Sequence, residues 1–222
     1  MSDTRAEVTQ APGGFGAAAR DLAPFPAIMS GYAVFYAVSW PFAWGWGGGV
    51  ALLIVLVAAA LLVVRAVTQI RHAALFRDTP TPEIERERKA MTVLNSITHP
   101  VYLFPSILLI AFGEGRWVLP LMVFVIGAHF LPMARILDRK VDYVLGPVTM
   151  VSAIIAGLLA LDTQVSWLVV FAVAGTGGAV STLSYALYLA KEYRRLCVRE
   201  GVAFPPREHR EHREHREHRE HA

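Results

Sequence analysis

The sequence is short of charge and of cysteine. Charged residues make up only 18% of its 222 positions, against about a quarter in ordinary soluble domains, and the mean hydropathy is +0.43. Cys197 is the single cysteine, which excludes an intramolecular disulfide and any metal site held by several cysteines. The composition therefore places the chain in a lipid bilayer rather than in water.

Catalytic signatures are missing as well. The sequence contains no His-Glu-x-x-His zinc helix, no Gly-x-Ser-x-Gly turn, no Walker loop and no dinucleotide fingerprint. The formal net charge is +3, but basic residues in a membrane chain first report its topology, so we expect no nucleic-acid partner. We expect a protein that is not an enzyme, and the sequence identifies no cofactor.

Apolar runs of membrane-spanning length are what the sequence does contain. A bilayer core of about 30 Å needs roughly 20 apolar residues in a helix. Six runs qualify, near residues 25–45, 48–69, 93–113, 116–135, 143–161 and 166–190. They predict an all-α, polytopic transmembrane bundle over residues 25–190, with about six spans arranged as three hairpins and a loop at 70–92.

Lysine, arginine and tryptophan predict the orientation of this bundle. Lys and Arg crowd the loop at 70–92, the turn near 135–142 and the chain after 190, whereas the turns between the other spans carry only Arg116. Because a Lys and Arg excess marks the cytoplasmic side, both termini are expected there. All five tryptophans fall at the opposite end, as indole at a membrane interface would: they are Trp40, Trp44, Trp46, Trp117 and Trp167.

Two segments outside the spans have readable patterns. Thr81 and Pro82, followed by Glu83 and Glu85, are typical of a helix start, so a charged cytoplasmic helix should lead into the third span. Residues 1–24 form a cytoplasmic N-terminal segment, and 191–222 a cytoplasmic tail that ends in five Arg-Glu-His repeats. The repeats favour disorder, with metal capture or acid sensing as alternatives; their histidines are His209, His212, His215, His218 and His221.

Two histidines lie inside predicted spans, where ionisable groups are functional candidates. Counting back from the turn at Glu114, His99 and His129 fall at nearly equal depth, roughly 10 Å inside the cytoplasmic boundary. Such a pair could hold a metal, pass a proton or bind a polar ligand. Asn95 and Ser96 would complete a ligand-binding site. The alternative is that each histidine only bonds a neighbouring helix.

Other polar residues surround the histidine pair in the sequence. Thr98 would add a polar group beside it, and Asp138, Asp142 and Tyr143 lie close to the same inner face. No third metal ligand follows from the spacing, so His99 and His129 are metal candidates only as a pair.

Small residues in the last two spans favour close helix packing. Gly175 and Ala179, like Ala153 and Gly157, follow the small-xxx-small spacing, and Gly178 continues the stretch. We expect spans five and six to pack through these positions. The same faces also make a homodimer plausible.

One stretch resembles known sequences. Residues Gly127 to Ala134, followed by a basic turn and Tyr143 to Gly146, resemble a segment of small multispanning bacterial membrane proteins of unknown function. The resemblance implies a bacterial inner-membrane setting and directs attention to His129. It implies no mechanism.

Three functions remain open at this point. The first is a transporter-like or small-ligand-binding bundle with a cytoplasm-facing polar cavity at the hairpin of spans three and four. The second is an accessory or scaffold subunit of a larger membrane complex. The third is an intramembrane metalloenzyme that uses the two histidines.

Overall fold

Seven α-helices and one short 3-10 helix form residues 13–204, the part of the chain that the computed structural model describes, and no strand occurs in this range. The all-α prediction is thus confirmed. The elements are α1 (Phe15–Leu22), α2 (Phe25–Ala37), α3 (Trp40–Ala73), α4 (Pro82–Ala111), η1 (Gly115–Trp117), α5 (Val118–Ile136), α6 (Asp142–Leu161) and α7 (Trp167–Arg199).

Five helices, α3 to α7, are long and apolar enough to cross a membrane, α5 being counted together with η1. The first expected span, 25–45, differs from this picture because α2 has only 13 residues. The chain restarts as α3 just before Pro41 and bends at Gly45, whose φ of 58° and ψ of −134° suit glycine alone. The first expected span is therefore divided between α2 and the first residues of α3 before the bend.

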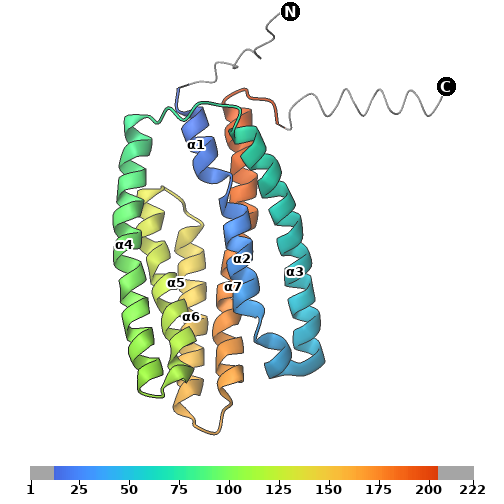
Figure 1. Ribbon diagram of the computed structural model, residues 1–222, viewed down its shortest axis with the longest axis vertical. Helices are drawn as coiled ribbons and strands as arrows, with labels where there is room; N and C mark the ends of the chain where they lie inside the picture. The colour runs from blue at the N-terminus through green and yellow to red at the C-terminus, as the bar shows by residue number, and fades with distance from the viewer. Residues whose placement is uncertain (1–12, 205–222) are drawn as a thin grey trace, which may run out of the picture.

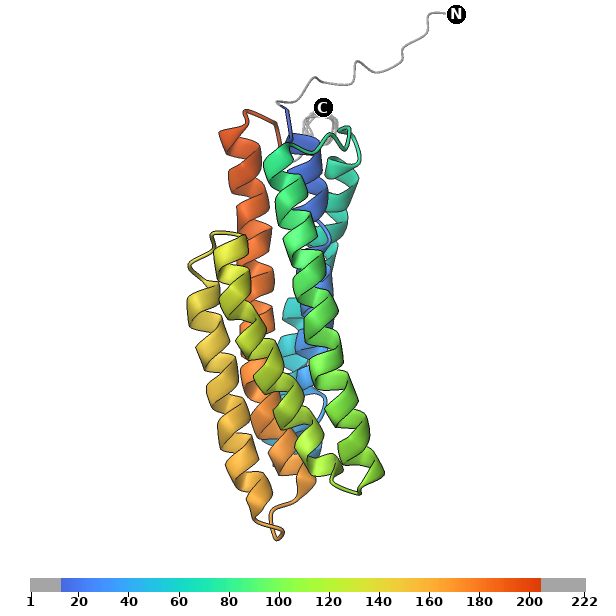
Figure 2. The ribbon, with the colours of Figure 1, turned by 90° about the vertical axis from the view of Figure 1, so that its left-hand side faces the viewer.

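The connections between helices lie at the two ends of the bundle (Figure 1). The tight connections α2–α3, α4–α5 and α6–α7 lie at one end, here called the turn end, and all five tryptophans belong to elements that start or finish there. The start of α1 and the end of α7 lie at the other end, here called the terminal end, with the α3–α4 connection (Figures 1 and 2). This arrangement matches three hairpins.

Helix α7 is the central helix. It packs on α2, α3 and α6, and sixteen of its residues are buried. Gly175 and Gly178 lie against Tyr36 of α2, and Gly177 lies against Ser152 of α6, so closely that a Cβ at any of the three would collide. The contact with α6 is completed by a hydrogen bond from Thr149 Oγ1 to Ser181 Oγ at 2.7 Å.

Helix α4 lies at the edge of the bundle (Figure 2). It packs chiefly on α5, and Ser106 is its single buried residue. Most of its apolar side chains, such as Phe104 and Leu108, are exposed. Apolar side chains on this scale are suited to lipid rather than to water.

At the terminal end, a cluster of polar groups ties α3 to α7 and to the chain after it. The buried ring of His72 lies between Tyr193 Oη, 2.7 Å from Nδ1, and the carbonyl of Ala203, 2.9 Å from Nε2. Gln69 Nε2 donates to Ala190 O at 3.1 Å. Because Ala203 O can only accept, Nε2 carries a proton and donates to it. We call His72, Gln69, Tyr193 and Ala203 the terminal latch.

The N-terminal segment contributes to the same end. Phe15 of α1 is buried edge-on against Phe76, with the ring centroids 4.8 Å apart. Buried Cys197 lies in the same cluster, and burial raises the pKa of its thiol to about 11. Residues 15–22, expected as part of a flanking segment, are therefore a helix docked on the bundle.

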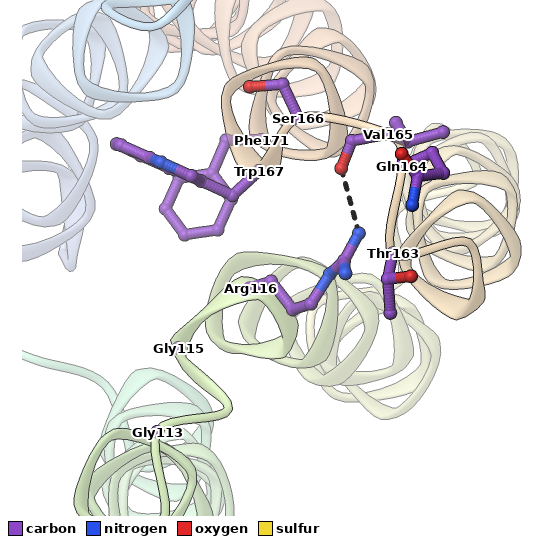
Figure 3. A pocket seen from close by; sticks show the side chains of 9 residues that line it. All are labelled: Gly113, Gly115, Arg116, Thr163, Gln164, Val165, Ser166, Trp167 and Phe171. Carbon is purple, nitrogen blue, oxygen red and sulfur yellow. Dashed lines mark hydrogen bonds between the residues drawn. The ribbon is translucent and has the colours of Figure 1, made fainter.

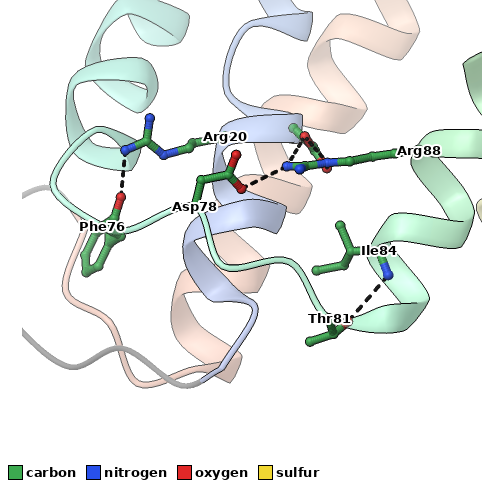
Figure 4. Close-up of polar contacts among 7 residues, drawn as sticks. Arg20, Phe76, Asp78, Thr81, Ile84 and Arg88 are labelled. Atoms are coloured by element: carbon green, nitrogen blue, oxygen red, sulfur yellow. Dashed lines mark hydrogen bonds and ion pairs between the residues drawn. The ribbon is translucent and has the colours of Figure 1, made fainter.

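The α3–α4 connection is shorter than expected, because helix occupies much of the predicted loop 70–92 and only residues 74–81 connect. Thr81 Oγ1 accepts from the Ile84 N–H at 3.4 Å and caps α4 at Pro82, as predicted (Figure 4). The expected charged helix and the third expected span prove to be one continuous helix, α4. Arg88 joins it to α1 through paired hydrogen bonds to Asp21, the shortest 2.9 Å.

Candidate functional site

The two histidines of the predicted spans, His99 and His129, lie on the two helices of the α4–α5 hairpin but form hydrogen bonds with different partners. His129 of α5 is half-buried and lies 2.8 Å from Thr98 Oγ1 of α4. His99 is exposed, and its Nδ1 donates to the Asn95 carbonyl of its own helix at 2.7 Å. The structure thus brings His129 to Thr98 rather than into a direct bond with His99.

The bond between His129 and Thr98 defines which ring nitrogen is free. Thr98 Oγ1 also lies 2.9 Å from the Leu94 carbonyl, which can only accept, so the hydroxyl proton goes there. His129 then donates from Nδ1 to Thr98, and its Nε2 is left as an acceptor in the neutral ring. No hydrogen bond to Nε2 is formed by residues 13–204.

The remaining predicted site residues, Asn95 and Ser96, are exposed on α4. Ser96 Oγ donates to the Thr92 carbonyl of its own helix at 2.8 Å. Tyr102 follows His99 one turn later, with ring centroids 5.7 Å apart. None of these side chains forms a hydrogen bond with α5 among the described residues, although His99 lies within electrostatic range of His129.

Asp142 is the most unusual group in the bundle. It is the first residue of α6, its side chain is fully buried, and neither carboxylate oxygen has a hydrogen-bond partner within the described range. A buried, unpartnered carboxylate is costly, by roughly 1–3 kcal/mol or more. The positive end of the α6 dipole offsets only part of this cost.

Charged and phenolic groups surround Asp142. It lies within electrostatic range of Arg139, Tyr185 and Tyr188. Arg139 does not pair with it; instead Nη1 donates to Tyr185 Oη at 2.8 Å. Tyr185 and Tyr188 stack with centroids 6.2 Å apart. We call Asp142, Arg139, Tyr185 and Tyr188 the Asp142 site.

Helix α5 separates the Asp142 site from His129. Phe130, next to His129 in sequence, packs edge-on against Tyr185 at 5.5 Å between centroids. Gly127 and Gly146 bring α5 and α6 together, since a Cβ at Gly146 would lie 2.9 Å from the Gly127 carbonyl. Two unsatisfied acceptors, His129 Nε2 and the Asp142 carboxylate, therefore flank one helix in the half of the bundle nearer the terminal end.

The small residues named from the sequence take different neighbours. Gly175 and Gly178 face Tyr36 of α2. Ala153 and Ala179 are buried in the cluster that α2, α6 and α7 share, whereas Gly157 has Trp117 Cζ3 at 3.7 Å as the nearest atom that a Cβ would meet.

No group of three His, Cys, Asp or Glu side chains comes together within residues 13–204 in a way that could hold a metal. The tail histidines His209, His212, His215, His218 and His221 lie outside the described residues. The metal candidates of the described part thus remain His99 and His129 alone.

Sequence reasoning placed Asp142 near the inner face but gave it no role, and it missed the terminal latch. An acidic residue at the first position of an apolar helix was the available signal for Asp142. The latch joins residues 121 apart in sequence, His72 and Tyr193, and no local pattern indicates such a pair.

Comparison with known proteins gives one match. Residues 89–187, from the first part of α4 into α7, match the model of a family of unknown function, DUF7010. This range includes His99, His129, Asp142 and Tyr185. No curated protein and no solved structure matches the chain.

Proposed function

We propose that this chain is a non-enzymatic, transporter-like membrane protein that binds a small ligand rich in hydrogen-bond donors in the half of the bundle nearer the terminal end. We place that end in the cytoplasm because Lys and Arg gather there and the tryptophans gather at the other end. We place the protein in a bacterial inner membrane because of the resemblance around Gly127 to Gly146. Both termini are then cytoplasmic, and α2 makes a sixth, shorter crossing.

The Asp142 carboxylate is the observation that carries this proposal. A structural carboxylate is normally held by donors, yet both Asp142 oxygens lack one in the described structure while Arg139 is turned toward Tyr185. Asp142 lies at the end of a span, next to the charged turn near 135–142, where a buried carboxylate without donors is a candidate ligand group. An amine or ammonium ligand supplies the donors and the charge that Asp142 lacks.

His129 supports the same ligand chemistry. Its Nε2 is a second acceptor, held in place because Nδ1 is bonded to Thr98. A polar cavity at the α4–α5 hairpin, facing the cytoplasm, would present the His129 acceptor. Asp142, on the other side of α5, would be a second and separate binding group. Asn95, Ser96 and His99 of α4 would line the approach to His129.

The test is the thermal stability of the detergent-purified protein with a panel of primary amines from methylammonium to putrescine. Tetramethylammonium serves as a ligand control because it has the charge but no N–H donor. A ligand at a hundredfold over its dissociation constant adds about 2.7 kcal/mol. Asp142→Asn should abolish the stabilisation, and exposed Asp138→Asn should retain it.

The opposite pattern would reject the amine site. If no amine stabilises the protein, or if Asp142→Asn responds as fully as the wild type, Asp142 is not a ligand group. Stabilisation by tetramethylammonium alone would show that charge, and not hydrogen bonding, is recognised.

A second function, an accessory subunit of a larger membrane complex, is favoured by α4. That helix has one buried residue and packs chiefly on one neighbour, so a partner helix could cover its apolar face. Native mass spectrometry of protein extracted in mild detergent distinguishes this function from the ligand-binding one. An accessory subunit requires a stoichiometric partner, either a second copy or another subunit. The intramembrane metalloenzyme remains the third hypothesis, and it needs a third ligand beyond His99 and His129.

A further inference from the structure

A cavity opens at the turn end, far from the Asp142 site. Its volume is about 600 Å³, within the usual range of ligand sites. It lies between the α4–α5 turn and the α6–α7 turn (Figure 3). Arg116 and the polar side chains of Thr163, Gln164 and Ser166 line it, with Trp167 and Phe171 as an aromatic wall.

Arg116 is the single Lys or Arg in the three turns of this end. Its Nη2 donates to the carbonyls of Asp162 at 2.8 Å and Val165 at 3.0 Å, which fixes the guanidinium against the α6–α7 turn. Nη1 makes no hydrogen bond to residues 13–204, and Nε is buried without a partner. A fixed cation with unused donors therefore borders the cavity.

The acidic groups of this end do not neutralise Arg116. No ion pair joins Glu114 or Asp162 to it among the described residues, although the sequence places Glu114 two positions away. Asp162 Oδ1 instead accepts the Gln164 N–H at 2.9 Å. Neither carboxylate belongs to the side chains that line the cavity.

We propose that this cavity binds an anionic oxygen group, a phosphate or carboxylate, on Arg116, with the apolar part of the same ligand against Trp167 and Phe171. Arginine is the residue best suited to such oxygens, because its planar donors remain charged at all physiological pH values. Phe171 and Trp167 contact each other edge-on, with centroids 5.3 Å apart. They form an apolar surface beside the charge.

The position of the cavity makes a phospholipid headgroup a natural source of this chemistry. Trp167 lines it, and tryptophan at the end of a span prefers the headgroup level. A free phosphate or carboxylate from the aqueous phase would offer the same oxygens without an acyl chain. This inference does not depend on the function of Asp142, which lies at the other half of the bundle.

The test titrates the full-length protein in neutral detergent with dihexanoyl phosphatidylglycerol, dihexanoyl phosphatidylcholine and inorganic phosphate, and reads the thermal midpoint. The phosphatidylglycerol should stabilise the protein more than the phosphatidylcholine does. Arg116→Gln should weaken that binding about tenfold or more, since a hydrogen bond to a charged group is lost. Glu114→Gln, in the same turn, should leave it unchanged or stronger.

Arg116→Gln also removes the bonds to the α6–α7 turn, so a second variant is needed. Thr163→Trp fills the cavity and leaves the Arg116 bonds in place; it should lose the phosphatidylglycerol effect. Equal stabilisation by inorganic phosphate would assign the site to a free anion. The proposal is overturned if neither anion stabilises the protein, or if Thr163→Trp and a folded Arg116→Gln variant respond like the wild type.

Discussion

Replacing Gly175 by alanine tests the close approach of α7 to α2 at a single atom. A Cβ at Gly175 would lie 2.1 Å from the Tyr36 carbonyl oxygen, whereas non-bonded heavy atoms in ordinary contact are about 3.5–4.0 Å apart. Alanine gains about 1 kcal/mol in helix propensity, but overpacking costs about 1–3 kcal/mol and sometimes more. Because the obstacle is the backbone of another helix, which cannot rotate away, we expect a net loss of about 2 kcal/mol.

Gly157 is the matched control on α6. A Cβ there would meet only Trp117 Cζ3 at 3.7 Å, an ordinary contact, so the propensity gain should survive. Gly157→Ala should therefore be neutral or more stable by up to about 1 kcal/mol.

Unfolding by a denaturing detergent, followed by circular dichroism, measures both variants in one assay. The expected difference between them is about 2–3 kcal/mol in favour of Gly157→Ala, the sum of the two estimates. If Gly175→Ala is as stable as Gly157→Ala, α7 and α2 are not in contact at Tyr36, and the central position of α7 is wrong.

Three further predictions concern the terminal end. Tyr193→Phe removes the hydroxyl that contacts His72 Nδ1 and the Gln69 carbonyl. The free energy of unfolding should therefore fall by about 1–3 kcal/mol. An unchanged free energy of unfolding would contradict the terminal latch. Burial lowers the pKa of His72, which lies beyond the expected span 48–69. The ordinary pKa of histidine is about 6.5, so the unfolded chain binds the proton more readily than the folded protein does. The contribution of neutral His72 to the free energy of unfolding is therefore present above about pH 6.5 and is lost as the pH falls below it. His72→Gln should reduce this loss between pH 7 and pH 5, and an identical pH profile would refute the assignment. The Cys197 thiol, with its pKa raised to about 11, should react with iodoacetamide at pH 8 only after unfolding, as mass spectrometry would show; rapid labelling of folded protein would mean that the thiol is exposed.

The main features of the fold could be predicted from the sequence because they depend on local composition. Apolar runs of about 20 residues report spanning helices directly, and the Thr81-Pro82 pattern reported the start of α4 because capping involves residues only three apart. The break between α2 and α3 was harder to predict. The run from 25 to 45 is apolar throughout, and hydropathy does not register the bend at Gly45.

The site residues were less accessible, since they depend on which helix faces which. Equal depth led us to expect His99 and His129 as a pair, but depth does not fix rotation about a helix axis. Thr98 bonds His129, whereas His99, one residue later and about 100° further round the helix, is exposed and bonds the carbonyl of Asn95 in its own helix. The same reasoning explains Arg116, whose partners lie across the bundle in another turn.

The stability of Asp142→Asn without any ligand tests the central claim most directly. If Asp142 is an unpartnered ligand group, replacing it with a neutral amide relieves a buried charge. The free energy of unfolding should then either rise or decrease slightly. Any decrease should not exceed about 1 kcal/mol, the stabilisation that the α6 dipole gives to the carboxylate. If Asp142 is instead held by structural donors, Asp142→Asn should lose about 3 kcal/mol or more. The second result would contradict the assignment of Asp142 as a binding group.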